Sequence, residues 1–161
     1  MKTFICITVR IALILLVLAT IAHAFYQSSL PPEKSTQQSD KVGEIIEEIV
    51  PPETKPGEYI QQNIRKLAHF TEFFFLGLWA ALYAVFFARK AVSFVNLCFF
   101  GMAIALLDET VQIFSQRGPS VKDVWIDLFG YAAALLLVLF VLLIVYVIRQ
   151  INRVRCGRIS I

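Results

Sequence analysis

The amino-acid sequence predicts an all-α integral membrane protein, a bundle of four transmembrane helices with both termini in the cytoplasm. Hydrophobic residues make up 58% of the 161 residues, whereas soluble domains are only about 45–50% apolar. Four apolar runs are each near or above the roughly 20 residues that a helix needs to cross a bilayer. No run alternates with a period of two, so helices are favoured over a membrane barrel. The runs cover residues 4–26, 67–88, 91–107 and 124–148.

The first run is interpreted as a transmembrane helix within residues 1–26. A cleaved signal peptide is the alternative, because Lys2 and Arg10 are basic, an apolar centre follows, and Ala22-His23-Ala24 resembles a cleavage site. Cleavage would leave an odd number of spans, which conflicts with the distribution of basic residues described below. The retained helix is therefore preferred.

Residues 27–64 are predicted to form an extracytoplasmic linker. Paired prolines at 31–32 and 51–52, with a stretch rich in Ser, Thr and Gln between them, are typical of linkers. Within this segment, Ile45, Ile46, Ile49 and Val50 would share one face of a short amphipathic helix. A mobile loop is the alternative for residues 42–50, and the sequence does not choose between the two.

Residues 65–148 hold the other three runs and form the predicted core of the protein. Gly77, Gly130 and Ala134 lie within these runs, where small residues let membrane helices approach closely. Residues 149–161 contain four arginines and are predicted to be a basic cytoplasmic tail.

The lysines and arginines predict the orientation in the membrane, because cytoplasmic loops carry an excess of them. Basic residues gather at the N-terminus, at Arg89-Lys90 and in the tail. Two predicted spans separate each of these places from the next, so all three can lie in the cytoplasm. Residues 27–66 and 108–123 would then lie outside. We expect a multi-pass protein of the plasma membrane.

Charge and cysteine content exclude several classes of partner. The net charge is only +3 and no basic stripe is present, so nucleic acid is not an expected partner. Cys6, Cys98 and Cys156 are far apart and form no C-x-x-C pair, which argues against a disulfide framework or a cysteine zinc site. Membrane lipids are the expected surroundings. No cofactor is predicted, and the oligomeric state is left open.

Two polar stretches stand at the predicted outer ends of the helices, in residues 65–72 and 108–127. Ionisable groups at membrane depth cost about 2.5–3.5 kcal/mol each, so they favour a functional role. Arg65, His69 and Glu72 are spaced to share one helix face, and positions 108 and 112, like 123 and 127, are four apart. The candidate polar cluster comprises Lys66, His69, Glu72, Asp108, Glu109, Gln112, Arg117, Asp123 and Asp127.

Several interpretations of this cluster remain open. The simplest is a network of salt bridges and hydrogen bonds that closes the end of the bundle. An anion site would use Arg65, Lys66 and Arg117 to bind a phosphate or carboxylate of a lipid-linked or cell-wall ligand. A hydrolytic site would use Asp108 or Glu109 as general base with His69 as acid or base, although no G-x-S-x-G motif is present.

A metal site is a weaker interpretation of the same residues. Histidine and carboxylate ligands suit zinc, iron or manganese. However, only one histidine contributes and no H-E-x-x-H motif occurs, so no metal ion is predicted. The side chains considered for this role are His69, Glu72, Asp108, Glu109, Asp123 and Asp127.

Two sequence signatures resemble those of the VanZ-like membrane proteins. The first is Lys66-x-x-His69-Phe70-x-Glu72-Phe73-x-x-Leu76-Gly77. The second is Asp108-Glu109-x-x-Gln112-x-Phe114-x-x-x-Arg117, followed by Asp123-Val124-x-x-Asp127-x-x-Gly130. The resemblance covers about residues 60–140. Phe73 stands where many relatives have tyrosine, and Gln116-Arg117-Gly118-Pro119 varies the usual turn.

The resemblance implies a small integral membrane protein of the Gram-positive cell envelope. The named member of this family is associated with teicoplanin resistance. The leading hypothesis is therefore a protein without established enzymatic activity, whose outer-face polar site lowers susceptibility to this lipoglycopeptide antibiotic. One alternative is a membrane enzyme that modifies a lipid-linked or cell-wall component. Another is a structural polar cap on a bundle that binds partners.

Overall fold

The computed structural model describes residues 2–50, 54–87, 94–116, 118 and 120–158. Within these ranges the chain forms helices and no strand, which confirms the all-α prediction. Five helices follow one another along the chain: α1 Lys2–Ser29, α2 Pro32–Glu47, α3 Lys55–Phe87, α4 Phe94–Phe114 and α5 Val121–Arg158.

Four of the described helices are long and apolar enough to cross a membrane. Their apolar parts are Thr3–Ser29, Asn63–Phe87, Val95–Phe114 and Val121–Arg153. They match the four predicted runs in order, although each helix extends beyond its run. Charged residues end an apolar run without ending a helix, because most of them are good helix formers. The side of the membrane on which each terminus lies stays a prediction.

The segment predicted to be a linker contains a helix of 16 residues, α2. Pro32 stands at its start, where a missing backbone N–H costs nothing, and Glu33 in the first turn suits the positive end of the helix dipole. The Thr36 Oγ1 donates to the Pro32 carbonyl at 3.0 Å, so this polar side chain bonds within the helix. The helix ends at Glu47, and residues 49–50 of the predicted apolar stripe therefore lie beyond it.

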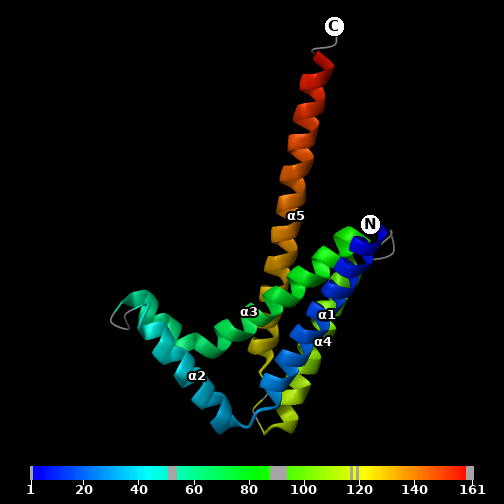
Figure 1. The fold of residues 1–161 in the computed structure, drawn as a ribbon. Coiled ribbons are helices and arrows are strands. Elements are labelled where there is room, and N and C mark those ends of the chain that lie inside the picture. Colours follow the sequence, from blue (N-terminus) through cyan, green and yellow to red (C-terminus); the bar gives the residue numbers. More distant parts are fainter. Residues whose placement is uncertain (1, 51–53, 88–93, 117, 119, 159–161) are drawn as a thin grey trace.

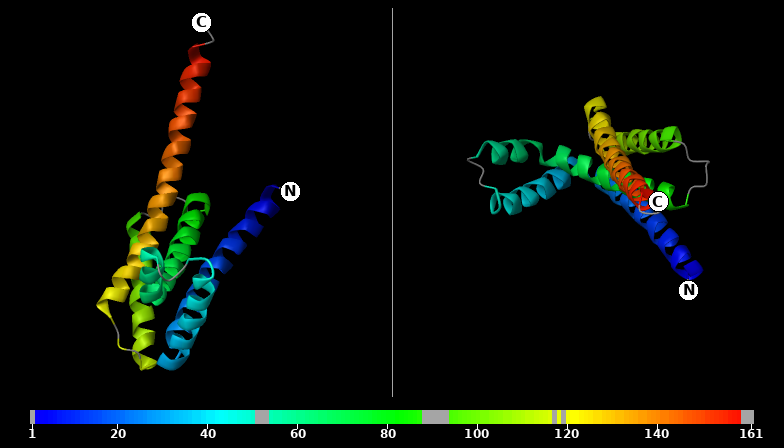
Figure 2. Two further views of the ribbon diagram at one scale, coloured as in Figure 1. Left: turned by 90° about the vertical axis from the view of Figure 1, so that its left-hand side faces the viewer. Right: turned by 90° about the horizontal axis from the view of Figure 1, so that it is seen from above.

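Helix α3 lies at the centre of the arrangement and contacts each of the other four helices. It runs obliquely across the molecule, while α1 and α4 lie side by side (Figure 1). Helix α2 turns back from the end of α1 and packs against the first part of α3. The C-terminal half of α5 extends past the other helices in Figure 1 and in the left-hand view of Figure 2.

Close contact between α3 and α5 depends on one glycine from each helix. A Cβ on Gly77 would lie 2.6 Å from the carbonyl oxygen of Tyr131 and 3.1 Å from the Cβ of Ala134. A Cβ on Gly130 would collide with the backbone carbonyl of Phe70. The structure thus confirms that these small residues let the helices approach, and it pairs α3 with α5.

The apolar core is small and lies mainly at this crossing. Phe73 and Leu76 of α3 pack there with Tyr131 and Leu135 of α5, all nearly fully buried. Beyond the crossing, apolar side chains of α5 such as Leu143 are exposed. Lipid tails are as apolar as leucine, so a membrane helix gains little by burying such residues against protein.

Candidate functional site

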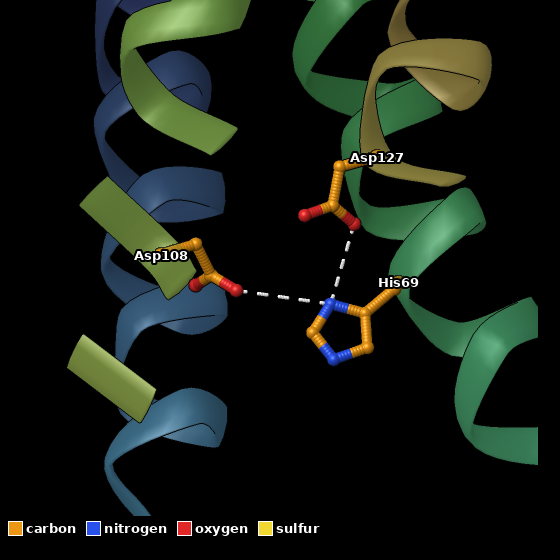
Figure 3. Close-up of side chains that lie close together, drawn as sticks. All are labelled: His69, Asp108 and Asp127. Carbon is orange, nitrogen blue, oxygen red and sulfur yellow. Dashed lines mark ion pairs between the residues drawn. The ribbon is translucent and has the colours of Figure 1, made fainter. Parts of the chain in front are cut away.

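Three ionisable side chains from three different helices meet inside the bundle. His69 of α3 points between Asp108 of α4 and Asp127 of α5 (Figure 3). The His69 Nδ1 lies 3.3 Å from the Oδ1 of Asp127 and 3.8 Å from the Oδ2 of Asp108. Both aspartates are completely buried, and His69 is only 7% exposed. We call these three residues the His69 cluster.

Asp108 is fixed in place by neutral hydrogen-bond donors from α1 and α4. The Ser28 hydroxyl donates to its Oδ2 at 2.7 Å, and the Gln112 Nε2 donates to the same oxygen at 3.3 Å. The hydroxyl of Ser115 in turn donates to the Ser28 carbonyl at 2.8 Å, which joins the end of α1 to the end of α4. These bonds orient one carboxylate of the His69 cluster.

Glu109 connects α4 to the beginning of α5. Its Oε2 accepts a hydrogen bond from the backbone N–H of Ser120 at 2.9 Å, and its Oε1 accepts from the Gln112 Nε2 at 3.0 Å. The Ser120 carbonyl begins the hydrogen bonding of α5 by accepting from the N–H of Asp123 at 2.9 Å. Glu109 therefore helps to hold α5 in the position that brings Asp127 to His69.

Glu72 shares a helix face with Arg65 and His69, yet it pairs with a histidine of α1. Its Oε1 lies 3.1 Å from the Nδ1 of His23 on α1. The Glu72 side chain is 16% exposed and that of His23 is 57% exposed, so this ion pair lies near the surface of the bundle. It joins α1 to α3 beside the His69 cluster.

A cavity of about 830 Å³ lies between α1, α2 and α3 and includes His69 in its wall. Its other charged or titratable side chains are His23, Arg65 and Glu72. The rest of the wall is largely apolar, with Leu16, Ile46, Phe75 and Trp79 among its members. The cavity thus combines an apolar surface with a few charged groups, which is the usual composition of ligand pockets.

Most of the chain matches the model of a known protein family. A family model for VanZ/LLP1 matches residues 11–145, which is most of the chain. The chain belongs to the VanZ-like family. Both polar stretches lie within the match. No curated protein and no solved structure matches the chain.

In this VanZ-like membrane protein, five predicted site residues form one connected group. His69, Asp108 and Asp127 meet directly, and Gln112 bonds to both Asp108 and Glu109. Arg65 reaches this group from outside, because its guanidinium lies 3.4 Å from the Oε1 of Gln112. The contacts also show that both polar stretches of the VanZ-like sequence belong to one network.

Other predicted site residues of the VanZ-like chain lie away from the cluster. The exposed Lys66 donates to the Asn63 Oδ1 at 3.1 Å on its own helix. Asp123 lies one turn before Asp127 and is half-buried, but it is not part of the three-residue group. Arg117, predicted to bind an anion, lies outside the described residues.

Sequence reasoning missed the contribution of α1 to this VanZ-like site. Ser28 and His23 supply a hydrogen bond and an ion pair to the two polar stretches. His23 carried a usable signal, because an ionisable residue within an apolar span favours a polar partner. Ser28 carried none, because a serine at the end of a span shows no sequence pattern that separates a surface position from a contact.

Proposed function

We propose that this VanZ-like membrane protein acts in the cell envelope by binding an amphiphilic ligand at its polar site, and that binding lowers susceptibility to teicoplanin. The observation that supports the proposal is the cavity between α1, α2 and α3. Its volume of about 830 Å³ falls in the range of small-molecule sites, which is roughly 300–1,000 Å³.

The composition of the cavity wall favours a ligand with an apolar chain and an anionic group. Phe75 and Trp79 offer an apolar surface, while Arg65 offers a planar guanidinium suited to a phosphate or carboxylate. Both kinds of group occur together in lipid-linked and cell-wall precursors. Teicoplanin itself carries an acyl chain that embeds in membranes, so interference with its anchoring is a consistent outcome.

The orientation predicted from the basic residues supports this role. If both termini lie in the cytoplasm, α2 and the helix ends that carry the polar stretches lie on the outer side. Lipid-linked wall precursors and lipoglycopeptides meet on that side of the plasma membrane. A Gram-positive envelope is the setting implied by the family.

The test compares teicoplanin and vancomycin susceptibility in a sensitive Gram-positive host. We expect protection from the wild type and its loss in Arg65→Gln and in Glu72→Gln, because both side chains belong to the cavity wall. Lys122→Gln is the matched control, since it removes an exposed charge at the start of α5, outside the cavity. Membrane abundance is measured in parallel by immunoblotting.

Two results would reject this proposal. Equal protection by both cavity variants would exclude the site. No protection by the wild type would exclude the resistance role, and the family relationship would remain.

An enzymatic role is the second candidate, because His69 and Glu72 both line the cavity and could exchange a proton with a bound ligand. This hypothesis predicts a covalent change in envelope lipids or wall fragments when the protein is overproduced. Mass spectrometry of both fractions checks it, and identical spectra from producing and empty cells would exclude it.

A further inference from the structure

We propose that His69, Asp108 and Asp127 bind one divalent metal ion of the zinc, iron or manganese type. The sequence alone did not predict a metal, because only one histidine contributes and no H-E-x-x-H motif occurs. The structure brings one ligand atom of each residue to within 4.8 Å of the other two.

The distances from the His69 Nδ1 to the two carboxylates suit a single shared metal ion. Ligand atoms about 2.1 Å from a tetrahedral metal lie about 3.4 Å apart. The His69 Nδ1 lies 3.3 Å from the Asp127 Oδ1 and 3.8 Å from the Asp108 Oδ2. Figure 3 shows this nitrogen directed between the two carboxylates. Small side-chain rotations would bring all three atoms to bonding distance.

The hydrogen bonding of Asp127 supplies independent support. Its side chain is completely buried, yet within the described part of the chain neither of its oxygens accepts a hydrogen bond. The His69 Nδ1, which faces it, also has no hydrogen-bond partner there. Buried carboxylates are normally hydrogen-bonded, paired or bound to a metal. A cation between these atoms would satisfy all of them.

The charges of the cluster point in the same direction. Two buried carboxylates repel each other, and a protonated His69 would neutralise only one of them. The neighbouring charged groups are engaged elsewhere: Glu72 with His23, and Arg65 with Gln112. A divalent ion bound by a neutral histidine would balance the negative charges of both aspartates. No further charged group of the protein would be needed.

The ligand chemistry and its supporting contacts fit a transition metal. One imidazole with two carboxylates is a donor set used for zinc, iron and manganese rather than for calcium or magnesium. Ser28 and Gln112 hold Asp108 by hydrogen bonds, as groups behind metal ligands commonly do. Because His69 also lines the cavity, an ion here would lie beside any bound ligand.

The experiment measures metal content in the full-length protein purified in detergent. The protein is treated with a chelator, then equilibrated separately with Zn²⁺ or Mn²⁺, and the bound metal is determined by elemental analysis. We expect one ion per chain for the wild type, and affinity at least about tenfold weaker in His69→Gln and Asp127→Asn. Asp123→Asn is the control, because it removes a carboxylate one turn away on the same helix.

A second measurement covers the case in which these variants fail to fold. Electron spin-echo spectroscopy of Mn²⁺ bound to the wild type should show coupling to one imidazole nitrogen. The proposal would be overturned by absence of that coupling, by absence of stoichiometric metal, or by equal loss of metal in Asp123→Asn. The cluster would then bind protons and no metal ion. Neither measurement involves an antibiotic, so this proposal fails or succeeds separately from the proposed function.

Discussion

Ser28 and its neighbour Ser29 show how much a single side chain contributes to the site. The Ser28 hydroxyl is completely buried and donates to Asp108 at 2.7 Å, whereas the exposed Ser29 hydroxyl donates to the Tyr26 carbonyl of its own helix. We expect Ser28→Ala to lower the free energy of unfolding by roughly 1–3 kcal/mol, because it removes a hydrogen bond to a buried carboxylate. Chemical unfolding in detergent micelles measures this change.

Ser29→Ala is the matched control for that experiment. It removes a hydroxyl of the same type one residue away, so it should change stability by less than about 0.5 kcal/mol. Equal losses in the two variants would mean that the Ser28–Asp108 hydrogen bond contributes nothing specific.

Asp108→Asn separates a functional role of the cluster from a purely structural one. The asparagine amide keeps the size of the side chain and an oxygen for Ser28, but it removes the charge. We expect normal membrane abundance together with loss of teicoplanin protection. Immunoblotting of membranes beside susceptibility assays checks both quantities. Reduced abundance with unchanged protection per molecule would instead favour the structural polar cap.

At the scale of the helices, the crossing of α3 and α5 sets the geometry of the site. Gly130 touches the backbone of Phe70, the residue that follows His69, and Asp127 lies one turn before Gly130 on α5. A methyl group at this contact would push the two helices apart. The separation of His69 and Asp127 would then increase, because both lie beside the contact.

We therefore expect Gly130→Ala to destabilise the fold by about 1–3 kcal/mol, as overpacking at a close contact does. Gly118→Ala is the control, because a Cβ at that exposed position would have nothing within 4 Å. Thermal unfolding of both variants in detergent provides the measurement. A Gly130→Ala protein as stable as the Gly118→Ala protein would show that α3 and α5 can separate without cost.

The helix boundaries show what local sequence patterns miss. Hydrophobicity located all four spans, but α5 continues for 38 residues, or about 57 Å, although a bilayer core is only about 30 Å thick. Its last turns contain arginines, which are good helix formers even where water replaces lipid. Likewise, Pro32 suggested a linker, yet proline at a helix start favours α2.

At the scale of the whole molecule, the orientation in the membrane is the main untested prediction. An even number of spans places both termini on the same side, and the basic residues predict that this side is the cytoplasm. We expect alkaline phosphatase fused after Asp40 to be active in the extracytoplasmic space. The same enzyme fused after Arg153 should be inactive. The reverse pattern would place the cavity on the cytoplasmic side.

Retention of α1 bears on the same question, because cleavage after residue 24 would remove contacts that α1 makes with α3 and α4. Leu13 and Ala24 are buried against the rest of the molecule, and the His23–Glu72 ion pair joins α1 to α3. An uncut first helix stays a prediction. The molecular mass of the purified protein measures it directly.

The sequence by itself located two polar stretches that supply much of the site, and it determined the class of the protein and its four spans. Length and hydrophobicity suffice for this, because a helix in lipid must satisfy its own backbone. Only the tertiary structure decided which polar groups meet. The meeting of His69, Asp108 and Asp127, and the support from Ser28, depend on how helices far apart in the chain cross. That crossing is set by close packing at Gly77 and Gly130, which no local spacing of polar residues specifies.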